Sequence, residues 1–393
     1  MVQQLGPNAL LAKFDVKSAS RMMPVHPQDF ELLGLCFQGK YYFDKCLPFG
    51  CSISCSVFEK FSTFLQWCVQ QKLPNGQLMH YLDDFLTDGT AGTKDCGDNL
   101  DTCLSTFQEL GVPVAHAMTV GPASCLTFLG LEIDTVRMQV RIPQEKIVNI
   151  NAIIHDMLAS GNHKVTRKAL QSLVGKLNFM CRAIPMGGPF CRRLIDAYTK
   201  VSHQAHGVRI TWGVREDLEV WLGFLGEFNG VSVFQNQKWA DNTCLQLFTD
   251  AASTVGFGAY YNGNWANGLW PREWVEDGST RDMTLLELFR IVLSVCLWGT
   301  AFANRKVLFF CDNQVVVSII NKQSSKAPRI MSLIRQLVLQ GLKHNILFKA
   351  RYITTHDNII ADALSRFQWE RFRNAAPSAN LHPTPLPDNL WQG

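Results

Sequence analysis

The stretch HYLDDFL, residues 80–86, sets two adjacent carboxylates in the middle of an apolar run. An ionised carboxylate that is buried without a partner is costly, so such a site either stays in water or has a cation beside it. A solvated turn between two strands is the ordinary explanation for a pair like Asp83 and Asp84. The positions of other acidic residues in the chain indicate which of the two, a solvated turn or a cation site, is correct.

The composition is that of an ordinary globular protein of 393 residues, with 47% hydrophobic and 18% charged residues. At roughly 100 to 200 residues per domain, this length predicts two or three domains. The composition excludes a disordered chain. The net charge is only +4, so any binding of nucleic acid would need local basic patches.

Cysteine usage and hydropathy bear on the cellular location. The thirteen cysteines are scattered, which favours reduced thiols, and no signal peptide is recognisable. The most apolar stretch, residues 285–303, is interrupted by Glu287 and Arg290, which argues against a transmembrane segment. We therefore expect an intracellular protein, in the cytoplasm and/or the nucleus.

Hydrophobic periodicity and turn residues divide the chain into two strand-containing blocks separated by helices. In the first block they predict a strand over 9–16, a hairpin turning at 38–40, helices over 54–71 and 96–111, and a strand over 77–82. Residues 145–200 are predicted to be mainly helical. The second block opens at residue 244 and mixes strands with helices, as in an α/β sandwich.

Three carboxylates of the first block occupy strand ends. Asp15 closes the apolar strand, Asp83 and Asp84 form the tip of a later hairpin, and LPFGCSISCSVF (47–58) lies between them as a turn that runs into a helix. Carboxylates converging from two strands can hold two divalent cations, which activate a hydroxyl nucleophile and stabilise a phosphate leaving group. The order of these pieces favours the cation site over the solvated turn.

These stretches resemble motifs A, B and C of a reverse transcriptase palm, and residues 111–134 resemble its motifs D and E. Over roughly residues 9–370, including LQSLVGKLNFMCRAIPMGGPFCRRLID (170–196), the chain is most similar to DIRS-like (tyrosine-recombinase) retrotransposon polyproteins. The resemblance implies that Asp15 and Asp83 are the principal Mg²⁺ ligands, with Asp84 in support. It also implies that Phe49 and Gly50 border the nucleotide, and that the partners are an RNA template, a DNA primer and dNTP.

The palm departs from the family pattern in three ways. Ser20 stands where the family has an aromatic residue that crowds out a ribose 2′-OH, so this pocket residue predicts poor discrimination against ribonucleotides. Met118 stands where a lysine normally protonates pyrophosphate. The chain also starts just before motif A, so the fingers are expected to be largely missing. Polymerase activity is therefore predicted to be impaired.

A second set of acids recurs along the second block: Asp250, Glu287, Asp312 and Asp362. Glu287 lies in TLLELFRIVLS, where nearly every neighbour is apolar and a carboxylate needs compensation. For Glu287 alone, a structural carboxylate paired with Arg290 is the competing interpretation. The order of the four acids on this pattern of strands and helices resembles the RNase H domain fused to reverse transcriptases.

In that family the four acids bind two Mg²⁺ (or Mn²⁺) ions, which generate hydroxide and stabilise the departing 3′ oxygen as RNA is cut opposite DNA. Asn313 resembles the family residue after the third acid. The family commonly has a histidine at the position of Tyr352. His356 lies nearby in the sequence, but an ordinary solvated histidine is the simpler interpretation.

The predicted fold is therefore a multidomain α/β and α+β chain. We expect a reverse transcriptase palm over 1–135, a helical thumb and connection over 136–240, and an RNase H-like α/β domain over 241–370. Residues 371–393 contain several prolines and are predicted to be a flexible tail.

The predicted function is that of a retrotransposon-derived reverse transcriptase and ribonuclease H that cleaves RNA in RNA/DNA hybrids with two divalent cations per site. An integrase or transposase shares the second fold but uses three acids, and Asp362 and the upstream palm argue against it. The more serious alternative is an inert or domesticated remnant that only binds nucleic acid. Basic residues of the helical region contact phosphates or form a solvated face; they are Lys164, Arg167, Lys168, Lys176, Arg182, Arg192 and Arg193.

Overall fold

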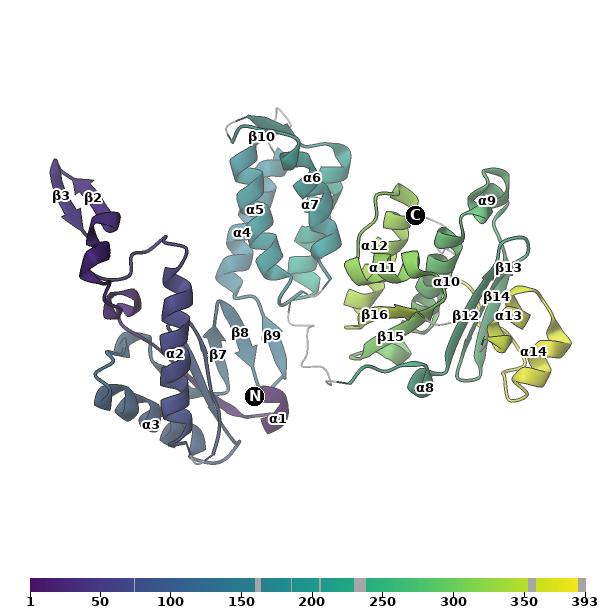
Figure 1. The fold of residues 1–393 in the computed structure, drawn as a ribbon. Helices are drawn as coiled ribbons and strands as arrows, with labels where there is room; N and C mark the ends of the chain where they lie inside the picture. The colour runs from purple at the N-terminus through teal and green to yellow at the C-terminus, as the bar shows by residue number, and fades with distance from the viewer. Residues whose placement is uncertain are drawn as a thin grey trace. The chain divides into compact units, whose positions relative to one another are not determined.

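The computed structural model describes residues 1–393 except 74, 160–163, 185, 205, 230–237, 353–357 and 388–393. The chain divides into two compact units, Met1–Pro143 and Gln144–Gly393 (Figure 1). The first boundary lies at 143 rather than the predicted 135, because residues 139–141 pair with a strand of the first unit.

The first unit is built on a four-stranded antiparallel sheet with strand order β4-β5-β1-β6. Its strands are β1 (Leu10–Asp15), β4 (Leu78–Tyr81), β5 (Asp84–Gly89) and β6 (Val120–Ala123). The helices α2 (Ser54–Gln70) and α3 (Asp95–Glu109) pack against this sheet. The elements predicted over 9–16, 54–71, 77–82 and 96–111 are confirmed, with shifts of a few residues at their ends.

Three fully buried aromatic rings fix the sheet to α3. The rings of Phe14 and Phe85 stack with centroids 5.3 Å apart, and Phe107 meets both edge-on. Aromatic pairs in these geometries contribute beyond the burial of their area. Because Phe14 and Phe85 directly precede or follow the acids at the strand ends, this packing also fixes where those acids emerge.

Smaller elements complete the first unit. The hairpin of β2 (Gly34–Phe37) and β3 (Lys40–Phe43) turns at Gln38 and Gly39, whose φ angles are positive as a tight hairpin turn requires. A second antiparallel sheet contains β7 (Cys125–Phe128), β8 (Leu131–Asp134) and β9 (Gln139–Arg141), and α1 (Val2–Leu5) begins the chain.

The second unit opens with helices, as predicted for residues 145–200. They are α4 (Gln144–Ala159), α5 (Arg167–Met180), α6 (Arg192–Thr199) and α7 (Trp212–Glu227), with a short ribbon of β10 (Lys164–Thr166) and β11 (Gly207–Arg209). Thr166 and Thr211 cap α5 and α7, because each side-chain oxygen accepts a hydrogen bond from a backbone N–H of the first turn. Leu170, Leu177 and Trp221 are buried among these helices.

The rest of the second unit is an α/β structure. Antiparallel strands β12 (Leu247–Ala252), β13 (Gly256–Tyr261) and β14 (Asn264–Leu269) form one sheet, and β15 (Lys306–Cys311) pairs in parallel with β16 (Leu347–Tyr352). The helices are α8 (Asn242–Leu245), α9 (Arg272–Glu276), α10 (Met283–Trp298), α11 (Gln314–Lys322), α12 (Pro328–Lys343) and α13 (Ile359–Ser365).

Helix α10 is the core helix of this structure, in contact with β12, β13 and α12. Among the described residues, Met283–Phe302 is the one segment long and apolar enough to cross a membrane, but 78% of its most apolar window is buried in the protein. Its apolar character is therefore explained by packing inside the second unit.

The segment after residue 368 differs from its prediction. Trp369–Ala375 form α14 with a fully buried Phe372, and the Trp265 indole donates a hydrogen bond to the Asn380 carbonyl at 2.7 Å. The Thr384 N–H donates to the Trp265 carbonyl, also at 2.7 Å. The prediction of a flexible tail from residue 371 is therefore wrong over 371–387, because apolar residues of this segment pack against the β12–β14 sheet.

Candidate active sites and their counter-ions

The first carboxylate set lies where β1 ends and β5 begins. Asp15 is the last residue of β1, Asp84 is the first residue of β5, and the two are direct cross-strand partners. Asp83 lies in the turn between β4 and β5, where it is exposed, after Leu82 in a left-handed conformation. The structure thus makes Asp84, rather than the predicted Asp83, the direct neighbour of Asp15.

The electrostatics of this pair favour a bound cation. Burial, together with the negative charges of Asp15 and Asp83, raises the pKa of Asp84 to about 6, although Lys13 opposes the shift. The Oδ1 atom of Asp15 is buried without a hydrogen-bond partner. A buried carboxylate oxygen without a donor and a second carboxylate beside it are the arrangement that a divalent cation compensates. The donor set of Asp15 and Asp84 therefore fits such an ion.

The other residues predicted to belong to the palm lie in short helices and turns. Ser20 lies in the short 3₁₀ helix Ala19–Met22, with its hydroxyl oxygen buried and without a partner. Phe49 is 88% exposed, and Gly50 follows it with φ +86° in the turn before α2. Met118 is exposed at the end of the 3₁₀ helix His116–Met118. Phe49 and Gly50 thus form an open rim rather than a closed pocket.

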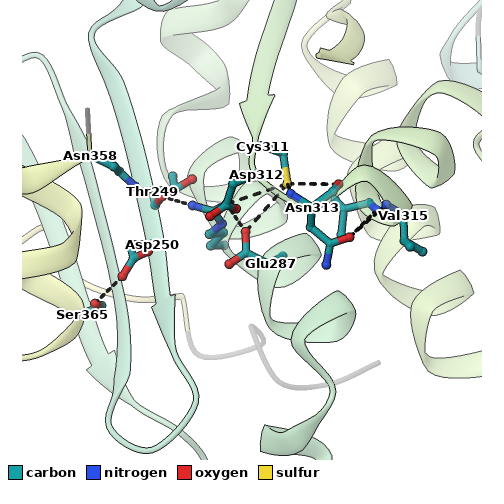
Figure 2. Close-up of polar contacts among 11 residues, drawn as sticks. Thr249, Asp250, Glu287, Cys311, Asp312, Asn313, Val315, Asn358 and Ser365 are labelled. Carbon is teal, nitrogen blue, oxygen red and sulfur yellow. Dashed lines mark hydrogen bonds and ion pairs between the residues drawn. The ribbon is translucent and has the colours of Figure 1, made fainter. Parts of the chain in front are cut away.

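The second carboxylate set is carried by four different elements, and Figure 2 labels three of its acids, Asp250, Glu287 and Asp312. Asp250 lies on β12, Glu287 on α10, Asp312 directly after β15, and Asp362 on α13. Ligand atoms of Glu287, Asp312 and the neighbouring Cys311 all lie within 4.8 Å of one another, the one such group in the part of the chain that the structure describes. Asp250 and Asp362 do not join it at that distance.

Arg290 lies inside the group formed by Glu287 and Asp312. Its guanidinium forms an ion pair with the Glu287 carboxylate, lies 3.1 Å from Asp312 Oδ1, and donates a hydrogen bond to the Thr249 carbonyl. The Arg290 and Glu287 side chains are only 4% and 6% exposed. The contact with Arg290 that was considered as the alternative for Glu287 is present, and it extends to Asp312.

The two remaining acids also have donors from the chain itself. Figure 2 shows Asp250 directed toward Ser365, whose hydroxyl donates to Asp250 Oδ2 at 2.6 Å. Asp362 accepts from Arg366 at 2.8 Å and from Arg371 at 2.5 Å. Burial opposes ionisation of Asp362, but these hydrogen bonds outweigh it and lower its pKa. Each acid of the second set therefore accepts a contact from the chain itself, from a guanidinium at Glu287, Asp312 and Asp362 and from a hydroxyl at Asp250. A divalent cation at Glu287 and Asp312 would have to compete with Arg290.

Local packing explains how α13 comes so close to the sheet. Gly258 is the cross-strand partner of Asp250, and a Cβ atom there would lie 2.7 Å from the backbone nitrogen of Ser365. Only glycine admits that approach, which brings Ser365 to Asp250. Asn313 has a separate structural role, because its side chain caps α11 by accepting from the Val315 N–H at 2.9 Å.

Sequence reasoning missed some of the residues around the second set. The place of Cys311 at the end of the predicted strand could have indicated that it lies beside Asp312. Helical spacing could have indicated that Ser365 and Arg366 lie near Asp362. The contact between Arg371 and Asp362 gave no such signal, because it needs α14. Tyr352 ends β16 and is 45% exposed, and His356 lies outside the described residues.

The helical part carries a cavity of about 640 Å³ between α4 and α5, lined in part by Lys146, Lys176 and Phe179. The Lys146 ammonium lies 4.7 Å from the Phe179 ring centroid. Of the predicted basic residues, Arg192 and Arg193 pair with Asp196 and Glu216, Arg167 donates to the Ser202 carbonyl, and Lys168 is exposed. Part of the basic set thus has structural partners.

Comparison with known proteins shows similarity to retroviral polyproteins. No family model matches the chain. It is 25% identical over 240 residues, 61% of its length, to the Pro-Pol polyprotein of feline foamy virus, and 26% identical over 196 residues to the Gag-Pro-Pol polyprotein of squirrel monkey retrovirus. It spans 19% and 10% of those polyproteins.

Solved structures agree on the fold. The foamy viral protease-reverse transcriptase matches with a TM-score of 0.50 and 16% identity, both in complex with double-stranded DNA and in complex with RNA/DNA hybrid. The matches cover 89% and 88% of this chain, and 58% and 44% of those chains. The chain thus has a fold similar to that of a reverse transcriptase, and its similarities are to retroelement polyproteins without distinguishing the DIRS-like group.

Proposed function

We propose that this chain is the reverse transcriptase and ribonuclease H region of a DIRS-like retrotransposon, which binds RNA/DNA hybrid and holds divalent cations at Asp15 and Asp84. The observation that carries the proposal is the buried, unpartnered Asp15 Oδ1 beside the cross-strand carboxylate of Asp84. The similarity of the fold to a foamy viral protease-reverse transcriptase supports it.

Asp15 and Asp84 would hold the cations of the first set, two of them in the full site, and the exposed Asp83 adds negative charge nearby. Bound Mg²⁺ or Mn²⁺ supplies activation of a primer hydroxyl and stabilisation of the departing pyrophosphate. Asp84 must release its proton to act as a ligand, which its pKa of about 6 permits at neutral pH.

The neighbouring residues limit this chemistry. Met118 has no proton to give to the leaving group, and the loss of a general acid costs about 10²- to 10⁴-fold in rate. Ser20 is too small to exclude a ribose 2′-OH. We therefore propose slow extension of a DNA primer on an RNA template, with weak discrimination between dNTP and rNTP.

For the second set, binding without cleavage is the second candidate function. RNase H cleavage by Asp250, Glu287, Asp312 and Asp362 would need cations at acids that already have donors from this chain. Because these acids are already in contact with donors, we propose that the RNase H-like part binds hybrid and supports the fold without cleaving RNA. The basic helical region, through exposed residues such as Lys168, supplies phosphate contacts in this proposal.

Primer extension and hybrid binding by the full chain test the proposal together. We expect a labelled RNA/DNA hybrid to bind with an affinity that falls steeply with salt, and Mn²⁺-dependent extension to disappear in Asp15→Asn and Asp84→Asn while hybrid binding persists. Asp101→Asn, an exposed acid on α3, is the matched control. Absence of hybrid binding, or fast and dNTP-selective synthesis, contradicts the proposal.

A further inference from the structure

Arg290 occupies the centre of the Glu287 and Asp312 group as a permanent positive charge. Glu287 and Arg290 are three residues apart on α10, a spacing that places two side chains on the same face of a helix. The strand end of β15 brings Asp312 to the same guanidinium, 3.1 Å away. The Thr249 carbonyl of β12 accepts another of its hydrogens. Three elements therefore converge on one side chain.

The guanidinium and a divalent cation compete for the same oxygen atoms. Mg²⁺ binds carboxylate oxygens at about 2.0 to 2.1 Å in near-octahedral geometry. An ion that bridges Glu287 and Asp312 would have to enter the space between carboxylates that both already contact Arg290. Glu287 and Arg290 are buried and Asp312 is 31% exposed. Like charges repel in such a partly buried site, so the ion and the guanidinium compete for the same oxygen atoms.

Both its charge and its burial keep Arg290 in contact with these carboxylates. A guanidinium stays protonated throughout the physiological range, and the side chain is 4% exposed. Its departure would leave Glu287 buried and charged. The contact is therefore not a switch that ordinary conditions reverse, and the pairing is a fixed property of this sequence.

We propose that Arg290 is a built-in counter-ion that takes the place of a divalent cation at Glu287 and Asp312 and keeps the second carboxylate set free of metal. This inference rests on the proposed function, since it concerns the cation site of the RNase H-like block. It assigns Arg290 a specificity-determining role: the residue decides whether these acids bind a metal ion at all.

The test counts Mn²⁺ ions by electron paramagnetic resonance on the full chain. Asp15→Asn and Asp84→Asn are introduced first, so that the first set contributes no site. In this background we expect no Mn²⁺ site that depends on Asp312. Adding Arg290→Ala should create one, at least about tenfold tighter than any residual binding, and Asp312→Asn should remove it again.

Arg329→Ala is the matched control, because it also removes an arginine ion pair of the same unit, with Asp277, far along the chain from the acids. It should create no site. Mn²⁺ binding that is present with Arg290 intact and lost in Asp312→Asn overturns the proposal, as does a folded Arg290→Ala protein without an Asp312-dependent site.

If Arg290→Ala does not fold, the protein that retains Arg290 decides the question. A shift of its melting temperature by Mn²⁺ that vanishes in Asp312→Asn overturns the proposal, and the absence of such a shift supports it. Hybrid binding is measured on the same samples. Its loss in every sample would refute the proposed function, whereas the Mn²⁺ count concerns the counter-ion alone.

Discussion

The two carboxylate sets of this chain look alike in the sequence and differ in their surroundings. At the first, Asp15 and Asp84 are cross-strand partners, Asp15 Oδ1 is buried without a hydrogen-bond partner, and the pKa of Asp84 is raised to about 6. At the second, three arginines and a serine supply donors to the four acids. Acids in motif order therefore do not identify a metal site until their counter-ions are known.

The largest expected effect concerns chemistry at the first set. Asp15→Asn should reduce Mn²⁺-dependent primer extension by at least about 100-fold, since it removes a carboxylate that would hold the cation on which the reacting phosphate depends. Asp312→Asn should leave the extension rate within about twofold of the unmodified chain. Rates are compared on one primer and RNA template under single-turnover conditions. An equal reduction of the extension rate in both variants would contradict the proposed difference between the two carboxylate sets.

A second prediction concerns stability at the second set. Arg290→Ala should lower the free energy of unfolding by about 3 to 5 kcal/mol, because it leaves the buried Glu287 charge unpaired. Arg329→Ala, which breaks the exposed pair with Asp277, should lower the free energy of unfolding much less. Urea unfolding measures both. The pairing would not be structural if the two variants lost the same stability.

Neutralising an acid of the first set should stabilise the protein, whereas removing Arg290 from the second set should destabilise it. The folded-state pKa of Asp84, about 6, lies above its ordinary value of 3.8, so the folded protein holds this proton more tightly than the unfolded chain. Ionisation therefore destabilises the fold as pH rises from about 4 to about 6. Asp84→Asn should remove the part of that decline due to Asp84. It should stabilise the protein at pH 8 by on the order of 1 to 2 kcal/mol, less than the full shift implies, because water screens this partly exposed carboxylate.

The control for that effect is Asp83→Asn, at an exposed neighbour in the turn, which should change stability much less. Unfolding curves at pH 4, 6 and 8 give the comparison. Asp217 has the same sign, because burial raises its pKa to about 6 despite Arg335 and Arg193, so the Asp84→Asn protein keeps the part of the decline that is due to Asp217. A destabilised Asp84→Asn protein at pH 8 would show that the pair is not strained.

The smallest expected effect is on hybrid binding. Lys168→Ala and Lys176→Ala should each weaken binding similarly for all sequences and reduce the salt slope by about 1, as expected for a lost phosphate contact. Arg193→Ala, whose guanidinium is engaged by Glu216, is the comparison and should leave the slope nearly unchanged. An unaltered slope in the lysine variants would remove the helical region from the proposed interface.

Local signals in the sequence predicted much of this fold. An apolar run located β1, the turn residues 38–40 located the β2–β3 hairpin, and apolar periodicity located α2, α3 and α10. These features depend on neighbours along the chain. The apolar Phe372 and Ala376 pack against a sheet formed far earlier in the sequence, which a proline-containing segment did not indicate.

The candidate sites show the same division. The Glu287 and Arg290 pair could be anticipated because it follows helical spacing, but its extension to Asp312 required the end of a distant strand. The choice of Asp84 over Asp83 as the neighbour of Asp15 depends on a shift of one residue in strand register, which moves a side chain to the other face of the sheet. Leu82 in a left-handed conformation sets that register.

The packing of α14 determines where the chain can be truncated to give a folded fragment. A fragment that ends at residue 370 would lose Phe372 from the core and Arg371 from Asp362, and would expose apolar surface that promotes aggregation. Its Asp362 would also be freer to accept a foreign ion. Limited trypsin digestion should therefore spare the bonds after Arg371 and Arg373 in the folded chain, and recombinant versions of the second block need to extend to residue 387.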